Sequence, residues 1–303
     1  MERTVEILTY ASSERFQNFL LGRKTLSQVK WNLPAPLLLA EVVQRQYKDD
    51  FSFCLKRHDP MLPYTGMVLP QKHTGTVVEK KAVSPLVTWL RLKIEGVSDF
   101  SFIPGQFINL EVGDGIYRSY SICNDTVGGG FVELAAITGR PGLGANLINS
   151  LKIDSSVGFV GPSGRYSYRK GGRKNVVFVA TSTGIAPFIP MIGQALEDPF
   201  VESITLVFGV RDQEDVFFED KFKKFLEMSP KFSYFICLSG VADGLKPPYF
   251  ANRVTFCLPD FVKDATDFYL CGNTAMIRDC SDIISKAGLE DFAIYTEAFN
   301  PNL

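Results

Sequence analysis

Residues 176–188, VVFVATSTGIAPF, carry the pattern that decides the fold. A continuous apolar run such as VVFVA is typical of a strand that is buried on both faces of a sheet. Small residues follow at 181–184, and Pro187 stands in the first turn of the apolar segment that comes next. This order predicts a strand, a tight turn and a helix, which is the repeating unit of a parallel sheet.

The same alternation continues to the end of the chain. Further apolar runs occur at residues 203–208, 232–238, 267–271 and 292–296. Helix-like segments lie at residues 186–196, 215–228 and 274–288. Strands that alternate with helices predict a doubly wound parallel sheet over residues 172–303, and such sheets bind ligands at the carboxyl ends of their strands.

Residues 74–171 show a different pattern, with short segments in which apolar and polar residues alternate, bounded by Gly, Pro and Asp. In LVTWLRLKI, at 86–94, Leu90 and Leu92 point to one face and Arg91 to the other. QFINLEV, at 106–112, alternates in the same way. Five or six such strands, interrupted by a helix at 144–151, predict a small antiparallel β-barrel. The expected fold is therefore an all-β domain followed by an α/β domain.

Residues 1–73 form a small N-terminal region whose role the sequence leaves open. It ends in a Pro-containing stretch, HDPMLPYTGMVLP, which is typical of a linker. The chain opens without a basic segment followed by an apolar run, so we expect no secretory signal. No apolar run has the length of a membrane span.

Composition restricts the partners. The chain has 32 basic and 33 acidic residues, so no overall field would attract nucleic acid or an anionic membrane. Its six cysteines are scattered without a Cys-x-x-Cys pair, which favours reduced thiols and a cytoplasmic location. His58 and His73 stand apart from any cluster of metal-ligating residues, so no metal site is expected.

The segment IYRSYSICN, at 116–124, places polar groups on both faces of a predicted strand. Arg118 and Tyr120 point one way, and Ser119 and Ser121 point the other. A guanidinium can bind a phosphate, a tyrosine ring can lie against a planar heterocycle, and hydroxyl groups can reach the edge of a ring. These groups suit a flavin nucleotide, and a half-buried strand with a surface arginine is the alternative.

With this segment the sequence resembles the ferredoxin–NADP reductase superfamily, from about residue 74 to the end. That family carries an Arg-x-Tyr-Ser signature, matched here by Arg118, Tyr120 and Ser121. The resemblance implies that Arg118 meets the flavin phosphate, that Tyr120 packs beside the isoalloxazine, and that Ser121 approaches its N5 edge. Three further barrel residues are expected to join them in cofactor binding: Ser119, Ile137 and Thr138.

The family's second flavin element is a Gly-x-x-Ser/Thr segment at a helix start, and GLGANL at 142–147 resembles it. Gly142 fits, whereas Ala145 stands where a hydroxyl is usual. The backbone N–H groups of Gly144, Ala145 and Asn146 would still bind phosphates at the positive end of the helix. A Gly-rich turn that only leads into a helix is the alternative.

The turn after residues 176–180 resembles the family's nicotinamide-binding turn, with Thr183 and Gly184 as the binding residues and Ser182 where relatives often carry Gly. Arg211 follows the next strand, near the place where relatives meet the adenosine ribose. It would pair with the 2′-phosphate of NADPH, whereas the acidic residues just after it suit NADH. The choice between the two cofactors stays open.

Two elements near the C-terminus complete the resemblance. Cys271, Gly272 and Met276 match the family's Cys-Gly-x-x-x-Met element, in which the cysteine lies against the nicotinamide. Glu297 and Phe299 resemble the terminal Glu-x-Phe of oxygenase reductases, where the carboxylate helps to manage protons at the flavin. An inert buried thiol and a frayed terminus are the corresponding alternatives.

Together these elements predict a flavin-dependent oxidoreductase with Ser121, Cys271 and Glu297 as catalytic residues. Hydride would pass from NADH or NADPH to FAD, and single electrons would then pass to a separate acceptor protein: a ferredoxin, a flavodoxin or an oxygenase component. Residues 1–73 contain one cysteine, Cys54, which cannot hold an iron–sulfur cluster. FMN is the less favoured flavin. A non-catalytic flavin- or nucleotide-binding regulatory module is the alternative function, motivated by Ala145 and Ser182.

Overall fold

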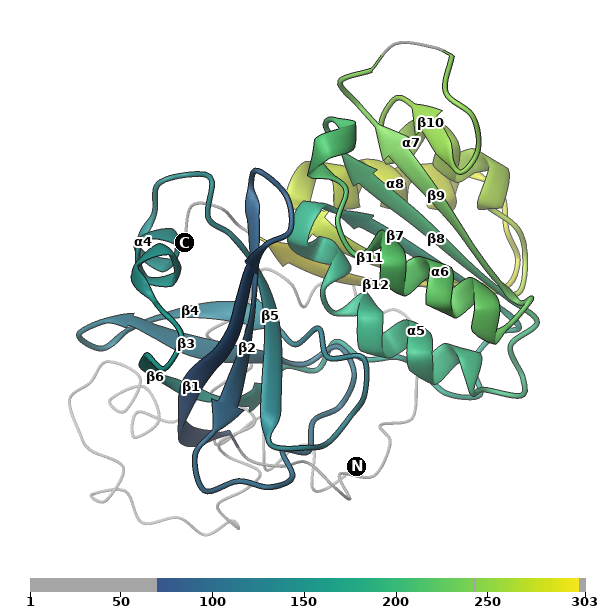
Figure 1. Ribbon diagram of the computed structural model, residues 1–303. Coiled ribbons are helices and arrows are strands. Elements are labelled where there is room, and N and C mark those ends of the chain that lie inside the picture. Colours follow the sequence, from purple (N-terminus) through teal and green to yellow (C-terminus); the bar gives the residue numbers. More distant parts are fainter. Residues whose placement is uncertain (1–69, 242–243, 300–303) are drawn as a thin grey trace, which may run out of the picture. The chain divides into compact units, whose positions relative to one another are not determined.

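The computed structural model describes residues 70–241 and 244–299 (Figure 1). All of these residues belong to one compact unit of the chain, which lies within Gly66–Leu303. The N-terminal region expected at residues 1–73 therefore lies outside the described residues, except for 70–73. Two six-stranded sheets make up the described part.

The first sheet is antiparallel, with strand order β4-β3-β6-β1-β2-β5. Its strands are β1 (Gln71–Ala82), β2 (Val87–Ile94), β3 (Phe107–Gly113), β4 (Ile116–Ser121), β5 (Phe131–Ile137) and β6 (Ser156–Ser163). A bridge between Ile122 and Leu134 joins the two outermost strands just beyond the end of β4. Helix α4 (Leu143–Ser150) lies between β5 and β6 in the chain. The predicted barrel with one inserted helix is confirmed.

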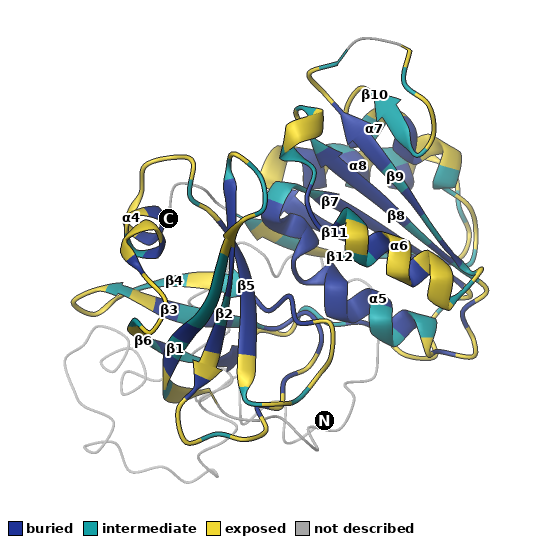
Figure 2. Ribbon diagram, viewed as in Figure 1, coloured by how far each residue is buried: buried dark blue, intermediate teal, exposed yellow. Residues whose placement is uncertain are grey.

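Alternation along the strands produces the barrel core. Leu90 and Leu92 of β2 are fully buried, and Arg91 between them points away from the core. Ile108 and Leu110 of β3 are also fully buried, as the period of two predicts. Figure 2 shows the resulting contrast between buried and exposed positions along these strands.

The second sheet is parallel throughout, in the order β10-β9-β8-β7-β11-β12. Its strands are β7 (Asn175–Thr181), β8 (Ser203–Val210), β9 (Phe232–Leu238), β10 (Tyr249–Ala251), β11 (Thr266–Asn273) and β12 (Phe292–Phe299). Its helices are α5 (Phe188–Leu196), α6 (Glu219–Met228), α7 (Val254–Cys257) and α8 (Thr274–Lys286). Strand order reverses at β7, between β8 and β11, so a ligand crevice is expected at their carboxyl ends.

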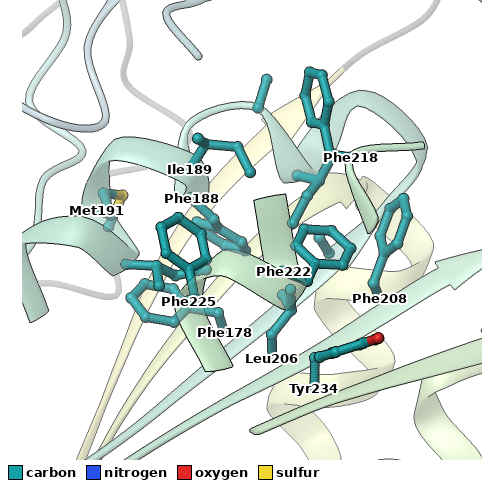
Figure 3. Close-up of a cluster of buried hydrophobic side chains, with 14 of the residues drawn as sticks. Phe178, Phe188, Ile189, Met191, Leu206, Phe208, Phe218, Phe222, Phe225 and Tyr234 are labelled. Atoms are coloured by element: carbon teal, nitrogen blue, oxygen red, sulfur yellow. The ribbon is translucent and has the colours of Figure 1, made fainter. Parts of the chain in front are cut away.

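Helices cover both faces of this sheet (Figure 1). Buried residues of α5 and α6 pack with Phe178 and Phe208 on one face, in the aromatic cluster of Figure 3. Buried residues of α7 and α8 pack with Val177 and Val179 on the other. Neighbouring residues of β7 thus enter different cores, which explains why the strand is apolar without alternation. The predicted doubly wound fold is confirmed.

Two helices begin later than their sequence pattern predicts. The segment predicted from residue 215 is helical only from Glu219, because Phe218 has a left-handed backbone with φ of 64°. The segment predicted from residue 186 begins at Phe188, after a 3₁₀ turn at Ser182–Ile185. Among the residues described, no helix combines the length and the apolar character that crossing a membrane requires.

Phe222 is the side chain that ties α6 to the sheet. It is fully buried, and its ring packs against Phe208 and Tyr234 (Figure 3). Phe222→Ala leaves a cavity there, so we expect it to lower the free energy of unfolding by about 3–5 kcal/mol. Urea unfolding followed by circular dichroism measures the change. Leu226→Ala on the same helix is the control, because that side chain is largely exposed and should cost well under half as much; equal losses would contradict this packing.

Candidate active site

Strand β4 presents its two faces to different surroundings. Arg118 and Tyr120 lie against α4, since a side chain at Gly144 would collide with the Tyr120 hydroxyl and approach Cγ of Arg118 to 3.8 Å. Ser119 and Ser121, on the other face, line a cavity of about 350 Å³. Arg118 lines this cavity as well, and its guanidinium donates to the carbonyl of Tyr117. The strand thus places a cation and two hydroxyl groups at one opening.

The wall facing Ser121 comes from the other sheet. Glu297, Ala298 and Phe299 at the end of β12 line the same cavity. The register of β12 on β11 places Glu297 beside Cys271 and Phe299 beside Asn273. Residues separated by about 176 positions in the chain therefore meet in one cavity, which spans the barrel and the parallel-sheet domain.

Glu297 carries the strongest electrostatic signal in this cavity. Its Oε2 is buried, with no hydrogen-bond partner among the described residues. Burial raises the pKa of Glu297 to about 7, and the Ser121 hydroxyl partly opposes this rise. A carboxyl group of that pKa can hold or release a proton near neutral pH.

The α4 segment offers backbone donors. Gly142 is its N-cap residue with an extended backbone, and no side chain caps the helix. The first-turn N–H groups, including those of Gly144 and Ala145, have no acceptor within the helix by geometry. Ala145 is buried and supplies no hydroxyl. Asn146 is exposed, but its N–H donates to the Gly142 carbonyl at 2.8 Å, so this N–H is not the free donor that the sequence predicts. A phosphate would therefore be held here by backbone groups together with Arg118.

A second cavity of about 530 Å³ lies at the carboxyl ends of the parallel strands. Of the residues predicted to bind cofactor, it is lined by these: Ile137, Thr183, Arg211, Gly272, Met276 and Phe299. Thr138 lies outside this lining, and its hydroxyl contacts that of Thr88 at 2.7 Å. The crevice expected at the point where strand order reverses is thus present.

Two backbone segments approach each other closely at Gly184 and Gly272, and this leaves no room for a side chain at either position. A Cβ on Gly184 would collide with the Cys271 carbonyl and come within 3.0 Å of the Gly272 Cα. Gly272 has φ of 150° and would meet Thr181 if it carried a side chain. The turn after β7 is therefore packed directly on the end of β11, which brings Thr183 and Met276 to the same cavity.

Cys271 is fully buried, and it is not among the residues lining either cavity. Burial and the nearby Glu297 raise the pKa of its thiol well above the ordinary value. The thiol is therefore neutral at pH 7 and lacks the thiolate that nucleophilic attack requires. Its place just before Gly272 fits a packing role under the cavity floor.

Several lining residues escaped the sequence analysis. Most come from loops, element ends or the short helix α7, and Asp279 comes from within α8: Tyr117, Arg140, Ser239, Arg253, Thr255, Asn273 and Asp279. Asn273 could have been found from the sequence, because Asn is a common N-cap residue before a helix. In the structure its side chain accepts from the Met276 N–H at 2.8 Å. Arg253 sits at the start of the four-residue helix α7, which no periodicity reveals.

The two cavities have linings that suit a flavin nucleotide and a nicotinamide nucleotide. Both volumes fall within the range of small-molecule sites. The first cavity has a guanidinium, hydroxyl groups and an unpartnered buried carboxyl oxygen, as a flavin ring and its phosphate require. The second has Arg140, Arg211 and Arg253, which suit the phosphates of a nicotinamide nucleotide. Phe299 lines both, so the cavities adjoin at this residue.

Comparisons with known proteins agree with this geometry. Residues 74–168 match the family model of the oxidoreductase FAD-binding domain, and residues 178–282 match that of the oxidoreductase NAD-binding domain. The toluate 1,2-dioxygenase electron transfer component of Pseudomonas putida is 28% identical over 215 residues, covering 69% of this chain and 62% of its own. The phenol hydroxylase P5 protein of Acinetobacter pittii is 27% identical over 237 residues, covering 76% and 66%. The chain thus spans somewhat less than two thirds of either relative.

Among solved structures, the ferredoxin NADP+ reductase from Neisseria gonorrhoeae with bound FAD and NADP superposes with a TM-score of 0.62 at 19% identity. The match covers 76% of this chain and 99% of that one. The two proteins therefore share the barrel and the doubly wound sheet.

Glu297→Gln tests the buried carboxyl without changing its size. Because folding raises the pKa of Glu297 from 4.5 to about 7, the folded protein holds this proton more tightly than the unfolded chain does. Wild-type protein should therefore lose stability relative to Glu297→Gln as the pH rises from about 4.5 to about 7, with a constant difference at higher pH. Urea unfolding of the apoprotein across this range measures the difference.

The exposed residue Glu290 provides the control for that substitution. Glu290→Gln should give a stability curve parallel to that of wild type. If Glu297→Gln also ran parallel to wild type, the buried and unpartnered state of this carboxyl would be wrong.

Proposed function

Because the chain belongs to the ferredoxin–NADP reductase superfamily, we propose that it is a reductase that takes hydride from NAD(P)H and delivers electrons one at a time to a separate protein. FAD and a nicotinamide nucleotide are the cofactors of its two domains. One observation carries the proposal: Phe299 lines both cavities, so a flavin in one and a nicotinamide in the other would meet at its ring. Hydride transfer requires such a shared cleft.

We assign roles to the residues of the cleft on this basis. Arg118 and the first turn of α4 bind the flavin phosphates. Ser121 and Glu297 line the cavity that would hold the flavin ring, and Glu297 would hold or release a proton there. Bound FAD supplies the conversion between two-electron and one-electron transfer. Phe299 would lie between the flavin and the nicotinamide nucleotide, because it lines both cavities.

The nicotinamide side is assigned to the carboxyl ends of the parallel strands. Thr183, Gly272 and Met276 hold the nicotinamide half, and Cys271 packs beneath it. Arg211 is highly exposed and lies 3.5 Å from Asp212, so this surface ion pair contributes little and leaves the guanidinium available to a phosphate. Arg253 lines the same cavity as Arg211 and adds a second cation there.

The acceptor is proposed from the names of the relatives. They include electron transfer components of dioxygenases and a ferredoxin–NADP reductase. An iron–sulfur protein, a flavodoxin or an oxygenase component of that kind would accept the electrons. The five cysteines of the described residues are free thiols, which supports a cytoplasmic location.

The direct test is an anaerobic titration of the purified protein with NADH and NADPH side by side. We expect yellow protein whose flavin absorbance bleaches with at least one of the two nucleotides, and the preferred nucleotide settles the cofactor choice. Protein that stays colourless and cannot be reconstituted with FAD, or that binds FAD but is not reduced by either nucleotide, would overturn the proposal.

Arg118→Ala tests the flavin site itself. Loss of a charged hydrogen bond to a phosphate costs about 1.5–3 kcal/mol, so the dissociation constant for FAD should rise by about ten- to a hundredfold. Quenching of FAD fluorescence by the apoprotein measures it. Lys93→Ala, an exposed cation on β2, is the control and should leave FAD affinity unchanged. Unchanged affinity in Arg118→Ala would remove this residue from the site.

A further inference from the structure

The interface between the barrel and the parallel-sheet domain is apolar at its centre. Val87, Trp89 and Cys123 of the barrel belong to the same buried cluster as Ile185 and Phe188 of the second domain. Apolar contacts of this kind are non-directional, so they favour burial without fixing one orientation. A charged group that crosses such an interface can fix the orientation, because it must meet its partners at defined positions.

Lys221 is such a group. It lies on α6, its side chain is only 12% exposed, and its Nζ reaches across to two barrel carboxylates. It forms an ion pair with Oδ1 of Asp125 and lies 3.9 Å from Oε2 of Glu133. The Nζ also lies 5.3 Å from the centre of the Phe218 ring. One cation of the nucleotide domain is thus surrounded by groups of both domains.

Glu133 is the second barrel carboxylate that faces Lys221. Its side chain is 8% exposed, and Arg91 binds its Oε1 at 2.7 Å. Its Oε2 is buried and has no hydrogen-bond partner among the described residues, so the charge of Lys221 is what faces this oxygen. Arg91 pairs with Oε1 alone, so Lys221 supplies the cation nearest to the other oxygen of this buried carboxylate. Lys221 therefore ties α6 to a fixed point on β5.

The partner loop is equally well fixed. Asn124 accepts from the Glu133 N–H at 2.8 Å and donates to the Phe131 carbonyl at 3.0 Å, so the residue before Asp125 is clamped to β5. Asp125 follows Ser121 by four positions, on the direct continuation of the flavin strand. Movement of Asp125 relative to the barrel is therefore coupled to the strand that carries Arg118 and Ser121.

The two domains are not closely packed beside the contact between Lys221 and Asp125. A cavity of about 500 Å³ lies there, lined by Pro104 and Val127 from the barrel and by Gln194 and Phe225 from the second domain. Lys221 and Asp125 stand in its wall. Where side chains of the two domains are separated by such a space, an ion pair across it adds a contact that resists their relative movement.

We propose that Lys221 is a positioning residue for hydride transfer. By pairing with Asp125 and Glu133, it holds the nucleotide domain on the barrel in the one orientation in which the two cofactor cavities share Phe299. This inference rests on the proposed function. A displacement of about 1 Å between reacting groups can slow a reaction by up to about a hundredfold, so a loosened interface would act on the rate of flavin reduction.

The first test uses the full-length apoprotein and needs no cofactor. Amide hydrogen exchange is compared in wild type, Lys221→Met, and Lys223→Met as a control on the same helix, where the side chain is 60% exposed and pairs within the helix with Glu219. We expect faster exchange in α6 and in residues 122–126 of Lys221→Met alone. Asp125→Asn, whose side chain is half-exposed, should show the same pattern and serves if Lys221→Met does not fold.

The second test separates the two half-reactions of the FAD-loaded protein. In stopped-flow experiments at saturating nicotinamide nucleotide, flavin reduction should be about ten- to a hundredfold slower in Lys221→Met than in wild type, and Lys221→Arg should recover most of the rate. Oxidation of the dithionite-reduced protein by ferricyanide should be equal in all variants, because it does not use the nucleotide domain.

The outcomes are distinct. Wild-type exchange and wild-type reduction rates in Lys221→Met and Asp125→Asn overturn the inference. Faster exchange with an unchanged reduction rate also overturns it, because Lys221 would then stabilise the interface without positioning the reactants. If wild-type protein itself is not reduced by NADH or NADPH, the proposed function fails, whereas the exchange comparison still decides whether Lys221 joins the two domains.

Discussion

The pairing of β12 with β11 is the constraint on which the candidate site depends. Its register sets Glu297 opposite Cys271 and Phe299 opposite Asn273. Side chains alternate along a strand, so a slip of one residue would turn Glu297 and Phe299 away from the barrel. The cavity facing Ser121 would then lose its carboxyl group, and the ring shared with the nucleotide cavity would be gone. The last strand of the chain therefore completes two binding sites at once.

A second constraint is the close approach of the turn after β7 to the end of β11. Gly184 meets the Cys271 carbonyl, and Gly272 meets Thr181, so each glycine is needed for backbone packing before any ligand is considered. Ser182, which lies between Thr181 and Gly184 in this turn, has φ of 50°, a conformation that glycine adopts more easily. The sequence pattern here encodes a packed junction of two strands, and the cavity is a consequence of that junction.

Much of this architecture could be predicted because its signals are local. Period two marked the barrel strands, continuous apolar runs marked β7 and β11, and the two faces of β4 followed from alternation alone. The start of α6 could not be predicted, because Phe218 is apolar and fits the helical pattern although its backbone is left-handed. Arg253 and the contacts of Lys221 were also hidden, since they depend on short elements and on residues distant in the chain.

The charged and titratable groups of the cleft indicate that it orients its ligands. Cys271 is a neutral thiol, because burial and Glu297 both disfavour its thiolate. Glu297 itself titrates near neutrality, so it can exchange a proton without keeping a permanent charge in the buried cavity. The fixed cations, Arg118 and Arg211, stand at the openings where phosphates would lie. Among the described residues, this cleft shows groups that orient ligands and hold a proton and no activated nucleophile, which fits the proposed hydride transfer between two bound rings.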